Sequence, residues 1–266
     1  MDEPTLSEEQ IRRYARHIVL PEIGGIGQAR LLQAKVLVVG AGGLGSPLLL
    51  YLAAAGIGTL GVVDDDRVDV TNLHRQVLHD TAGLGTAKVD SAAARLEALS
   101  PGTTIVRHAV RLDAANAEAI IAPYDLVADG SDSFATRAVV QDACLRLGRT
   151  LVSAAVQGTD GQLSTYKAHL GPPHPCLRCL YPEAPGADAL PSCAVGGVLG
   201  PAAGVVGTLQ AVEVVKEVLG IGDGLSGTLL LYDALGARLD RMAFRRSTAC
   251  PGPCARLARP EIPVPS

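Results

Sequence analysis

The sequence predicts an α/β fold in which helices cover both faces of a mainly parallel β-sheet. Over residues 30–155, apolar runs rich in valine alternate with helical segments rich in alanine and leucine, which is typical of parallel β–α units. A glycine-rich turn joins the first of these strands to the helix after it. From residue 161 the apolar residues alternate with polar ones, so we expect antiparallel C-terminal strands to extend the sheet.

The composition fits one large domain with an aliphatic core. Hydrophobic residues make up 48% of the 266 residues, but aromatic residues only 3%, and tryptophan is absent. We expect a single domain over residues 1–254, with a nucleotide-binding part at about 30–155. Residues 255–266 are rich in proline, and we expect them to form a disordered tail.

Charge and hydropathy exclude several classes of function. The formal net charge of −4 argues against binding to nucleic acid, which usually needs a basic surface. No apolar run reaches the roughly 18 residues that a membrane span requires. The N-terminus lacks the basic and apolar regions of a signal peptide. We therefore expect a cytoplasmic protein whose six cysteines stay reduced.

The strongest local signal is the glycine-rich turn. A buried strand is expected over 36–39, and Gly40-x-Gly42-x-x-Gly45 follows it and opens an apolar helix. A second strand, 60–63, ends in Asp64, about 20 residues further on. This order is typical of a Rossmann-like βαβ unit, in which the turn approaches phosphates and the acid holds a ribose. The turn alone indicates a nucleotide, with NAD as the default.

The remaining elements follow from capping residues and periodicity. Ser7-x-x-Gln10 has the spelling of a capping box, which predicts a helix over 8–17. The segment 201–219 is apolar nearly all round, so we expect a buried helix there. The pattern also predicts helices over 88–99, 114–122 and 134–147, and strands over 103–106, 126–128, 150–155, 161–166, 229–232 and 238–244.

Two cysteine pairs predict a structural metal site. Cys176-x-x-Cys179 and Cys250-x-x-x-Cys254 supply four thiolates, which suit tetrahedral Zn²⁺ with no position open for catalysis. Two unrelated pairs of buried or surface cysteines are the alternative. Both pairs lie in segments rich in proline and glycine rather than in core strands, which favours zinc. Cys144 lies in an apolar helix and is expected in the core.

Four charged residues are expected near the glycine turn. Asp64 and Asp132 follow the ends of two predicted strands, while Arg75 and Lys88 lie in or near polar loops at the same edge. Two cations can neutralise a triphosphate, and a carboxylate can hold Mg²⁺. A solvated rim of mixed charge would explain any one of the four. Together they fit ATP better than NAD, whose pyrophosphate carries less charge.

These motifs together resemble one known family. The chain is similar to the ubiquitin-activating-like adenylyltransferases, and most of all to the MoeB/ThiF/HesA group, from about residue 6 to residue 254. The matching motifs are Arg13-Tyr-x-Arg16, Gly40-x-Gly-Gly-Leu-Gly45, Asp64-x-Asp66, Thr71-Asn-Leu-x-Arg-Gln76, Gly85-x-x-Lys88, Ser131-Asp132, the paired cysteines and Gly207-Thr-Leu-Gln-Ala-x-Glu213.

The resemblance implies an activity and its partners. A homodimer would bind ATP with Mg²⁺ and adenylylate the C-terminal Gly-Gly carboxylate of a small ubiquitin-like sulfur-carrier protein, releasing pyrophosphate. The carrier expected is the small subunit of molybdopterin synthase, with a thiamine-pathway carrier as the alternative. Residues 156–254 would bind the carrier and zinc. No rhodanese-like domain follows Cys254, so a separate sulfur donor is expected.

The resemblance also assigns roles by position. Asp132 would hold Mg²⁺ at the reaction centre, Arg16 would reach into the partner subunit's site, and Cys193 matches a cysteine that some relatives link to the carrier. The family's usual Asp-Asn is Asp132-Ser133 here, and its second cysteine pair is normally spaced by two residues. The residues expected to bind ATP are Gly40, Gly42, Gly43, Gly45, Asp64, Asp66, Asn72, Arg75, Gln76, Lys88 and Asp132.

Three other functions fit parts of the pattern. An NAD-dependent oxidoreductase would need an acid or base near the turn, where His74 and His79 are the nearby histidines. A binding module could keep both sites without catalysis. The tRNA threonylcarbamoyladenosine dehydratases share the nucleotide motifs, but the acidic balance and the two cysteine pairs argue against them.

Overall fold

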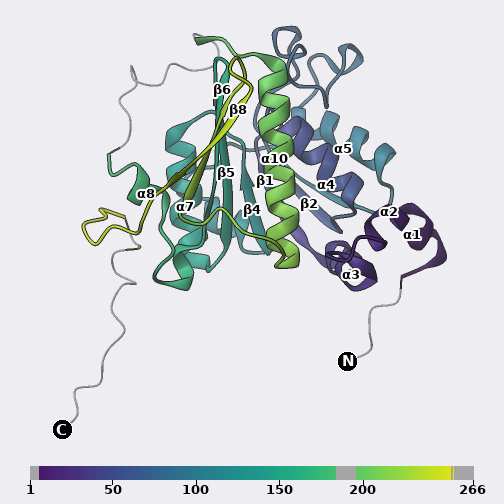
Figure 1. Ribbon diagram of the computed structural model, residues 1–266. Coiled ribbons are helices and arrows are strands. Elements are labelled where there is room, and N and C mark those ends of the chain that lie inside the picture. The colour runs from purple at the N-terminus through teal and green to yellow at the C-terminus, as the bar shows by residue number, and fades with distance from the viewer. Residues whose placement is uncertain (1–5, 184–195, 253, 255–266) are drawn as a thin grey trace.

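One eight-stranded sheet organises the computed structural model, which describes residues 6–183, 196–252 and 254 (Figure 1). The strand order is β3-β2-β1-β4-β5-β6-β7-β8. The strands are β1 Lys35–Val39, β2 Thr59–Val63, β3 Thr104–His108, β4 Leu126–Asp129, β5 Thr150–Gln157, β6 Asp160–Tyr166, β7 Thr228–Asp233 and β8 Arg238–Ala243.

The sheet has a parallel half and an antiparallel half. The five neighbouring strands β3, β2, β1, β4 and β5 pair in parallel, whereas β6, β7 and β8 each pair antiparallel to their neighbours. Val39, at the end of β1, is in register with Val63 of β2 and Asp129 of β4. The segments that follow these three residues therefore meet at one edge, the carboxyl edge of the parallel strands. The predicted fold class is confirmed.

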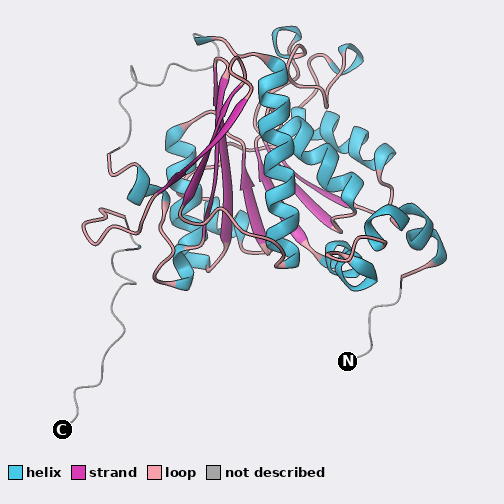
Figure 2. Ribbon diagram, in the orientation of Figure 1, coloured by secondary structure: helices cyan, strands magenta, loops and turns pink. Residues whose placement is uncertain are grey.

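Helices cover both faces of this sheet (Figure 2). Val36 and Val38 face a core that includes residues of α4, α5 and α10, while Leu37 and Val39 face a second core with α6 and α7. The α-helices are α1 Glu8–Arg13, α2 Ala15–Ile18, α3 Gly24–Gln33, α4 Gly45–Ala55, α5 Lys88–Leu99, α6 Ala117–Ile121, α7 Phe134–Leu147, α8 Leu177–Leu180 and α10 Gly200–Leu219, and the short 3-10 helices are η1 Val70–Asn72, η2 Thr81–Gly83 and η3 Ala168–Leu170.

Two sequence expectations are corrected. The helix predicted over 8–17 is divided into α1 and α2 at Tyr14, where the backbone leaves the helical conformation with φ −102° and ψ 16° and the ring lies against Gly56. Helix α10 is not buried all round: Val205 and Val212 are 39% and 54% exposed. The outer side of α10 stays open because α4 and strands β5 and β6 all contact the helix from its inner side (Figure 1).

Some expectations fall on residues that the structure does not describe. Cys193 and the proline-rich tail over 255–266 lie outside the described residues. Of the helices in the described ranges, none combines the length and the hydropathy that crossing a lipid bilayer requires.

Candidate active site and cysteine cluster

A cavity of about 350 Å³ opens at the carboxyl edge of the parallel strands. Its volume lies in the range of small-ligand pockets. Of the predicted ATP-binding residues, Gly45 and Asn72 lie outside its lining. The others line it directly: Gly40, Gly42, Gly43, Asp64, Asp66, Arg75, Gln76, Lys88 and Asp132.

The glycine turn needs its glycines for two different reasons. A Cβ on Gly45 would lie 1.9 Å from the carbonyl oxygen of Gly40, so Gly45 allows the turn to close. Gly43 lines the cavity, and a Cβ there would make only ordinary contacts with Ala203 and Arg75. Among the described residues, the N–H groups of Gly42 and Gly43 have no hydrogen-bond acceptor. The turn therefore presents free N–H groups to the cavity at the start of α4, an arrangement suited to an anion.

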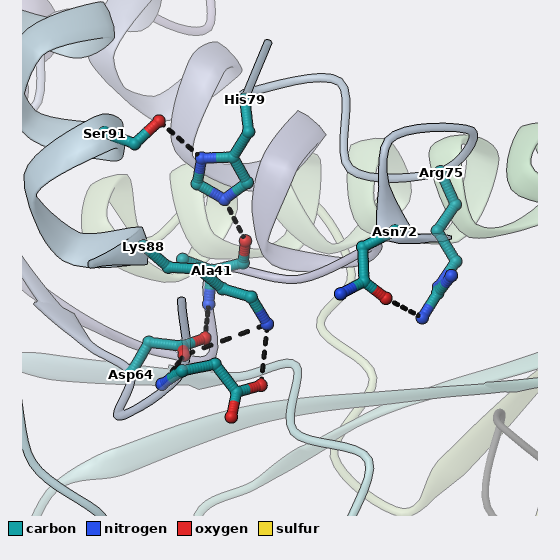
Figure 3. A network of polar contacts seen from close by, with 8 residues as sticks. Ala41, Asp64, Asn72, Arg75, His79, Lys88 and Ser91 are labelled. Carbon is teal, nitrogen blue, oxygen red and sulfur yellow. Dashed lines mark hydrogen bonds and ion pairs between the residues drawn. The ribbon is translucent and has the colours of Figure 1, made fainter. Parts of the chain in front are cut away.

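Lys88 is held in place by two carboxylates of the cavity wall (Figure 3). Its side chain is only 5% exposed, and its Nζ lies 2.7 Å from Asp66 Oδ2 and 4.0 Å from Asp64 Oδ1. Burial raises the pKa of Asp64, and the nearby Lys88 opposes that shift. Asp64 also accepts a 2.8 Å hydrogen bond from the Ala41 N–H, which ties it to the glycine turn.

Arg75 is positioned by the loop that carries it. Its Nη2 donates to Asn72 Oδ1 over 2.7 Å (Figure 3), and its Nη1 donates to the Thr71 carbonyl over 3.1 Å. Asn72 thus acts on the cavity through Arg75. The loop is pressed against α10, since a Cβ on Gly200 would lie 2.4 Å from the His74 carbonyl oxygen. The guanidinium is therefore held at the wall of the cavity.

Residues 130–133, which follow β4, and Arg137 of α7 form the opposite wall. The roles of Arg137 and of Asp129, the last residue of β4, were not predicted from the sequence. Asp129 is fully buried and accepts from Ser153 Oγ over 2.9 Å. Arg137 of α7 lies 3.8 Å from the Asp129 carboxylate and donates to the Ser131 carbonyl over 2.6 Å. Asp132 itself is exposed at the cavity. The sequence did offer one signal for this role, because Arg137 is the fourth residue of the helix that follows the Asp132 segment.

Ser133 replaces the asparagine of the family's usual Asp-Asn and takes a clear structural role. Ser133 is the N-cap of α7, and its Oγ accepts from the Thr136 N–H over 3.4 Å. Serine and asparagine are both strong N-cap residues, so the change preserves the start of the helix.

Helix α10 supports both walls from one side. A Cβ on Gly207 would lie 2.4 Å from the Leu44 carbonyl oxygen, so α10 packs directly against the start of α4. The buried Gln210 donates from Nε2 to the carbonyl oxygens of Asp129 and Val152, over 2.9 and 3.0 Å. Glu213 accepts from Thr165 Oγ1 and from the Leu225 N–H. The motif from Gly207 to Glu213 therefore fixes α10 to the carboxyl edge.

Several buried polar atoms at the cavity have no hydrogen-bond partner among the described residues. They are Gln76 Oε1, Ser131 Oγ and Arg137 Nε, although Arg137 also forms the ion pair with Asp129. All three residues line the cavity. Leaving a buried donor or acceptor unsatisfied is costly, so these atoms fit a site that binds a polar ligand.

Arg16 is not brought to this cavity. It is exposed on α2, next to Tyr14, which packs against Gly56 at the C-terminal end of α4. Arg13 donates to the carbonyl of Leu99 at the C-terminal end of α5. Both α4 and α5 begin at the carboxyl edge, so their C-terminal ends lie at the other edge of the sheet (Figure 1).

The two cysteine pairs converge into one cluster. Cys176 Sγ lies 3.2 Å from Cys254 Sγ, 3.6 Å from Cys250 Sγ and 3.7 Å from Cys179 Sγ. Backbone N–H groups of Ser247 and Gly252 approach the sulfur atoms of Cys179 and Cys250. The alternative of two unrelated pairs is therefore wrong, and the wide spacing of the second pair does not prevent convergence. Cys144 lies in the core, as expected.

Comparison with known proteins identifies the family. The profile of the ThiF family matches residues 14–252. The chain therefore belongs to the ThiF family. Among solved structures, that of E. coli MccB with MccA-N7isoASN has the same fold, with a TM-score of 0.80, 21% identity and coverage of 94% of this chain and 76% of that one.

Closer relatives are found among characterised proteins. The chain is 49% identical to the sulfur carrier protein adenylyltransferase of Thermus thermophilus, over 92% of this chain and 91% of that protein. It is 44% identical to the SAMP-activating enzyme E1 of Haloferax volcanii, over 93% and 90%. It is 51% identical to the Sus scrofa adenylyltransferase and sulfurtransferase MOCS3 over 91% of this chain, but it spans only 52% of that relative. The chain is thus an enzyme of the adenylyltransferase class.

Proposed function

We propose that this chain uses ATP to adenylylate the C-terminal Gly-Gly carboxylate of a small ubiquitin-like sulfur-carrier protein, releasing pyrophosphate. The observation that carries the proposal is the joining of Arg75, Lys88 and Asp132 with the free N–H groups of the glycine turn around one cavity. The names of the Thermus and Haloferax relatives support this reading.

The cavity supplies a partner for each part of ATP. The N–H groups of Gly42 and Gly43 would receive phosphate oxygens, and the Asp64 carboxylate would accept from a ribose hydroxyl. Arg75 and Lys88 would neutralise phosphate charge. The unsatisfied polar atoms of Gln76 and Ser131 fit such a ligand. Asp132 would hold Mg²⁺, an oxygen-seeking ion that lowers the charge on the phosphates when bound.

The reaction would depend on placement and charge rather than on a base. A carrier carboxylate is already ionised at neutral pH, so it can attack the α-phosphorus without losing a proton. A new O–P bond forms, and the bond from that phosphorus to the bridging oxygen of pyrophosphate breaks. Arg137 lines this cavity and also a smaller one that includes Tyr181, so its guanidinium is placed to hold an entering carboxylate. Arg75 and Lys88 would stabilise charge on the departing pyrophosphate.

We further propose that the active form is a homodimer. Arg16 is exposed and lies away from the cavity of its own chain, so it can complete a site only in a second copy. The exposed Val205 and Val212 offer apolar surface to such a copy. The carrier would be the small subunit of molybdopterin synthase or a related carrier, with Cys193 as a residue for a carrier link and a separate protein as the sulfur donor.

The cysteine cluster would hold a structural Zn²⁺. Zn–S bonds of about 2.3 Å in a tetrahedron require sulfur atoms about 3.8 Å apart. The observed separations of 3.6–3.7 Å for three pairs are close to this value, while that of Cys176 to Cys254 is shorter, at 3.2 Å. Four thiolates leave no coordination site open, so the ion would fix the end of the domain. Arg246 strengthens this connection through the carbonyls of Ala168 and His174.

ATP–pyrophosphate exchange tests the proposed function. We expect exchange only when a Gly-Gly-terminated carrier is present, and a loss of about 10²–10³-fold in Asp132→Ala, because a group that acts on the phosphates is removed. Asp223→Ala is the matched control, since Asp223 is exposed and does not line the cavity. Parallel assays with molybdopterin-type and thiamine-type carriers identify the partner. Tight binding of NAD without binding of ATP would overturn the proposal.

A further inference from the structure

His79 is a buried titratable residue beside the cavity that the proposed reaction does not use. It is only 6% exposed, and its ring connects two elements (Figure 3). Nε2 lies 2.9 Å from the Ala41 carbonyl oxygen, and Nδ1 lies 2.9 Å from Ser91 Oγ. Burial lowers the pKa of His79, so the ring is neutral at pH 7. Because a carbonyl can only accept, Nε2 carries the hydrogen and Nδ1 accepts from the Ser91 hydroxyl.

The residue that His79 contacts is the one at the centre of the glycine turn. Ala41 lies between Gly40 and Gly42, and both of its backbone polar groups are occupied. Its N–H donates to Asp64 Oδ2 over 2.8 Å, and its carbonyl accepts from His79. Gly40 has φ of +93°, a conformation that glycine adopts freely, so the turn has little intrinsic rigidity. The two hydrogen bonds at Ala41 supply that rigidity from outside the turn.

The partner of His79 belongs to the helix that carries the buried lysine. Ser91 and Lys88 are three residues apart on α5, so their side chains lie on the same side of that helix. His79 therefore links the glycine turn, which offers N–H groups, with the helix that offers Lys88. Displacing the ring would disturb both groups that face the phosphates.

We propose that His79 is a positioning residue that holds the glycine turn in its phosphate-binding conformation, with Ser91 orienting its ring. This inference rests on the proposed nucleotide site. In this role His79 neither contacts ATP nor transfers a proton. Its effect should be much larger on the phosphates than on the nucleoside, because the ring holds the glycine turn directly, whereas Asp64, the proposed ribose acceptor, is also held by the Asp66 N–H over 2.9 Å.

Calorimetric binding of ATP and of adenosine to the full chain tests the proposal. His79→Leu leaves the buried Ala41 carbonyl without its donor, and we expect the Kd for ATP to rise about tenfold while that for adenosine changes by less than about twofold. His79→Gln keeps an N–H group at a similar reach and should restore the ATP affinity to within about threefold. Ser91→Ala keeps the ring but frees its orientation, and should weaken ATP binding by about threefold.

The control is Tyr124→Phe, which removes a 2.8 Å hydrogen bond to His108 from the same sheet but does not touch the turn. Its ratio of ATP to adenosine affinity should equal that of the wild type. If His79→Leu weakens both ligands equally, or if glutamine fails to restore ATP binding, His79 is only a packing residue and the proposal is wrong. Should His79→Leu fail to fold, Ser91→Ala decides the question alone. A wild-type chain that binds no ATP would refute the nucleotide site itself.

Discussion

The cavity at the carboxyl edge and the cysteine cluster both gather residues that are far apart in the sequence, but they differ in how open they are. At the cavity, Asp66 has a side chain that is 68% exposed, and Asp132 is exposed too. In the cluster, Cys176 is 1% exposed and Cys254 is fully buried. Exposed charges are accessible to a ligand, whereas three of the four thiols in the cluster are buried and Cys179 is half-buried, which suits a structural role. The same domain thus separates chemistry from reinforcement.

The two regions also depend on different features of the chain. The cavity depends on backbone shape, because glycines allow the turn to close and leave its N–H groups free. The cluster depends on side chains, because four sulfur atoms from two distant segments of the chain must meet within 4.8 Å. A change of one methyl group should therefore damage the first region, and loss of one sulfur atom should damage the second.

The largest effect is expected for Gly45→Ala. The added Cβ would lie 1.9 Å from the Gly40 carbonyl oxygen, and a backbone atom cannot move aside without opening the turn. Such overpacking costs about 3 kcal/mol or more, which lowers Tm by about 10 °C in a domain of this size. ATP–pyrophosphate exchange should fall by more than about 100-fold. Thermal unfolding and exchange assays measure the two effects.

Gly43→Ala is the matched control for this change. A Cβ on Gly43 meets its nearest atom, Ala203 Cβ, at an ordinary 3.4 Å, so the free chain should keep its Tm within about 2 °C. The methyl group would enter the cavity and weaken ATP binding. Equal losses of stability in both variants would show that Gly45 is not needed for folding more than Gly43 is, and would contradict the two different roles given to these glycines.

The second-largest effect is expected in the cysteine cluster, for Cys176→Ser. Removal of one thiolate should abolish stoichiometric zinc and lower Tm by about 5–10 °C, because a bound metal stabilises only the folded chain. The Kd for ATP should change by less than about threefold, since the cluster lies outside the cavity lining. Elemental analysis, thermal unfolding and calorimetry provide the measurements.

Cys144→Ala controls for the loss of a buried sulfur. Cys144 packs in the core of α7 outside the cluster, so this variant should lose some stability and keep its zinc. A Cys176→Ser variant that retained zinc would contradict the four-thiolate site. One that lost ATP binding would show that the two regions are coupled.

The parallel half of the fold and most of the cavity could be predicted because their signals are local. A strand, a glycine turn and a helix follow one another within 36–55, and Asp64 comes at the end of the next strand. Parallel strands must place their ends at one edge, so the convergence of Asp64 and Asp132 needed no knowledge of side-chain packing. The cysteine pairs were recognisable for the same reason, since each pair is defined within a few residues.

What could not be predicted depends on contacts between distant segments. His79 acts on Ala41, which lies 38 residues away, and nothing in the local sequence distinguishes it from a loop histidine. Arg137 resembles a solvated helix residue until β4 places Asp129 beside it. The exposure of Val212 was missed because an apolar residue predicts a contact but does not say whether the same chain or another one provides it.

The smallest effect concerns Asp64, which lines the cavity although its side chain is largely buried, and it is measured as the pH dependence of stability. Burial raises its pKa in the folded state above the ordinary 3.8. The folded chain therefore favours the protonated form, so the contribution of Asp64 to stability is fully present below the unfolded pKa and is lost as pH rises through the folded pKa. Asp64→Asn does not titrate. Because its Nδ2 cannot accept a hydrogen bond from the Ala41 or the Asp66 N–H, its Tm should lie below that of the wild type near pH 3.5. As pH rises toward 7, the difference in Tm should shift in favour of the variant by no more than about 3 °C. A Tm difference that shifts in favour of the wild type over this range would show that Lys88 outweighs burial, and that the carboxylate is held at the cavity by its ion pair.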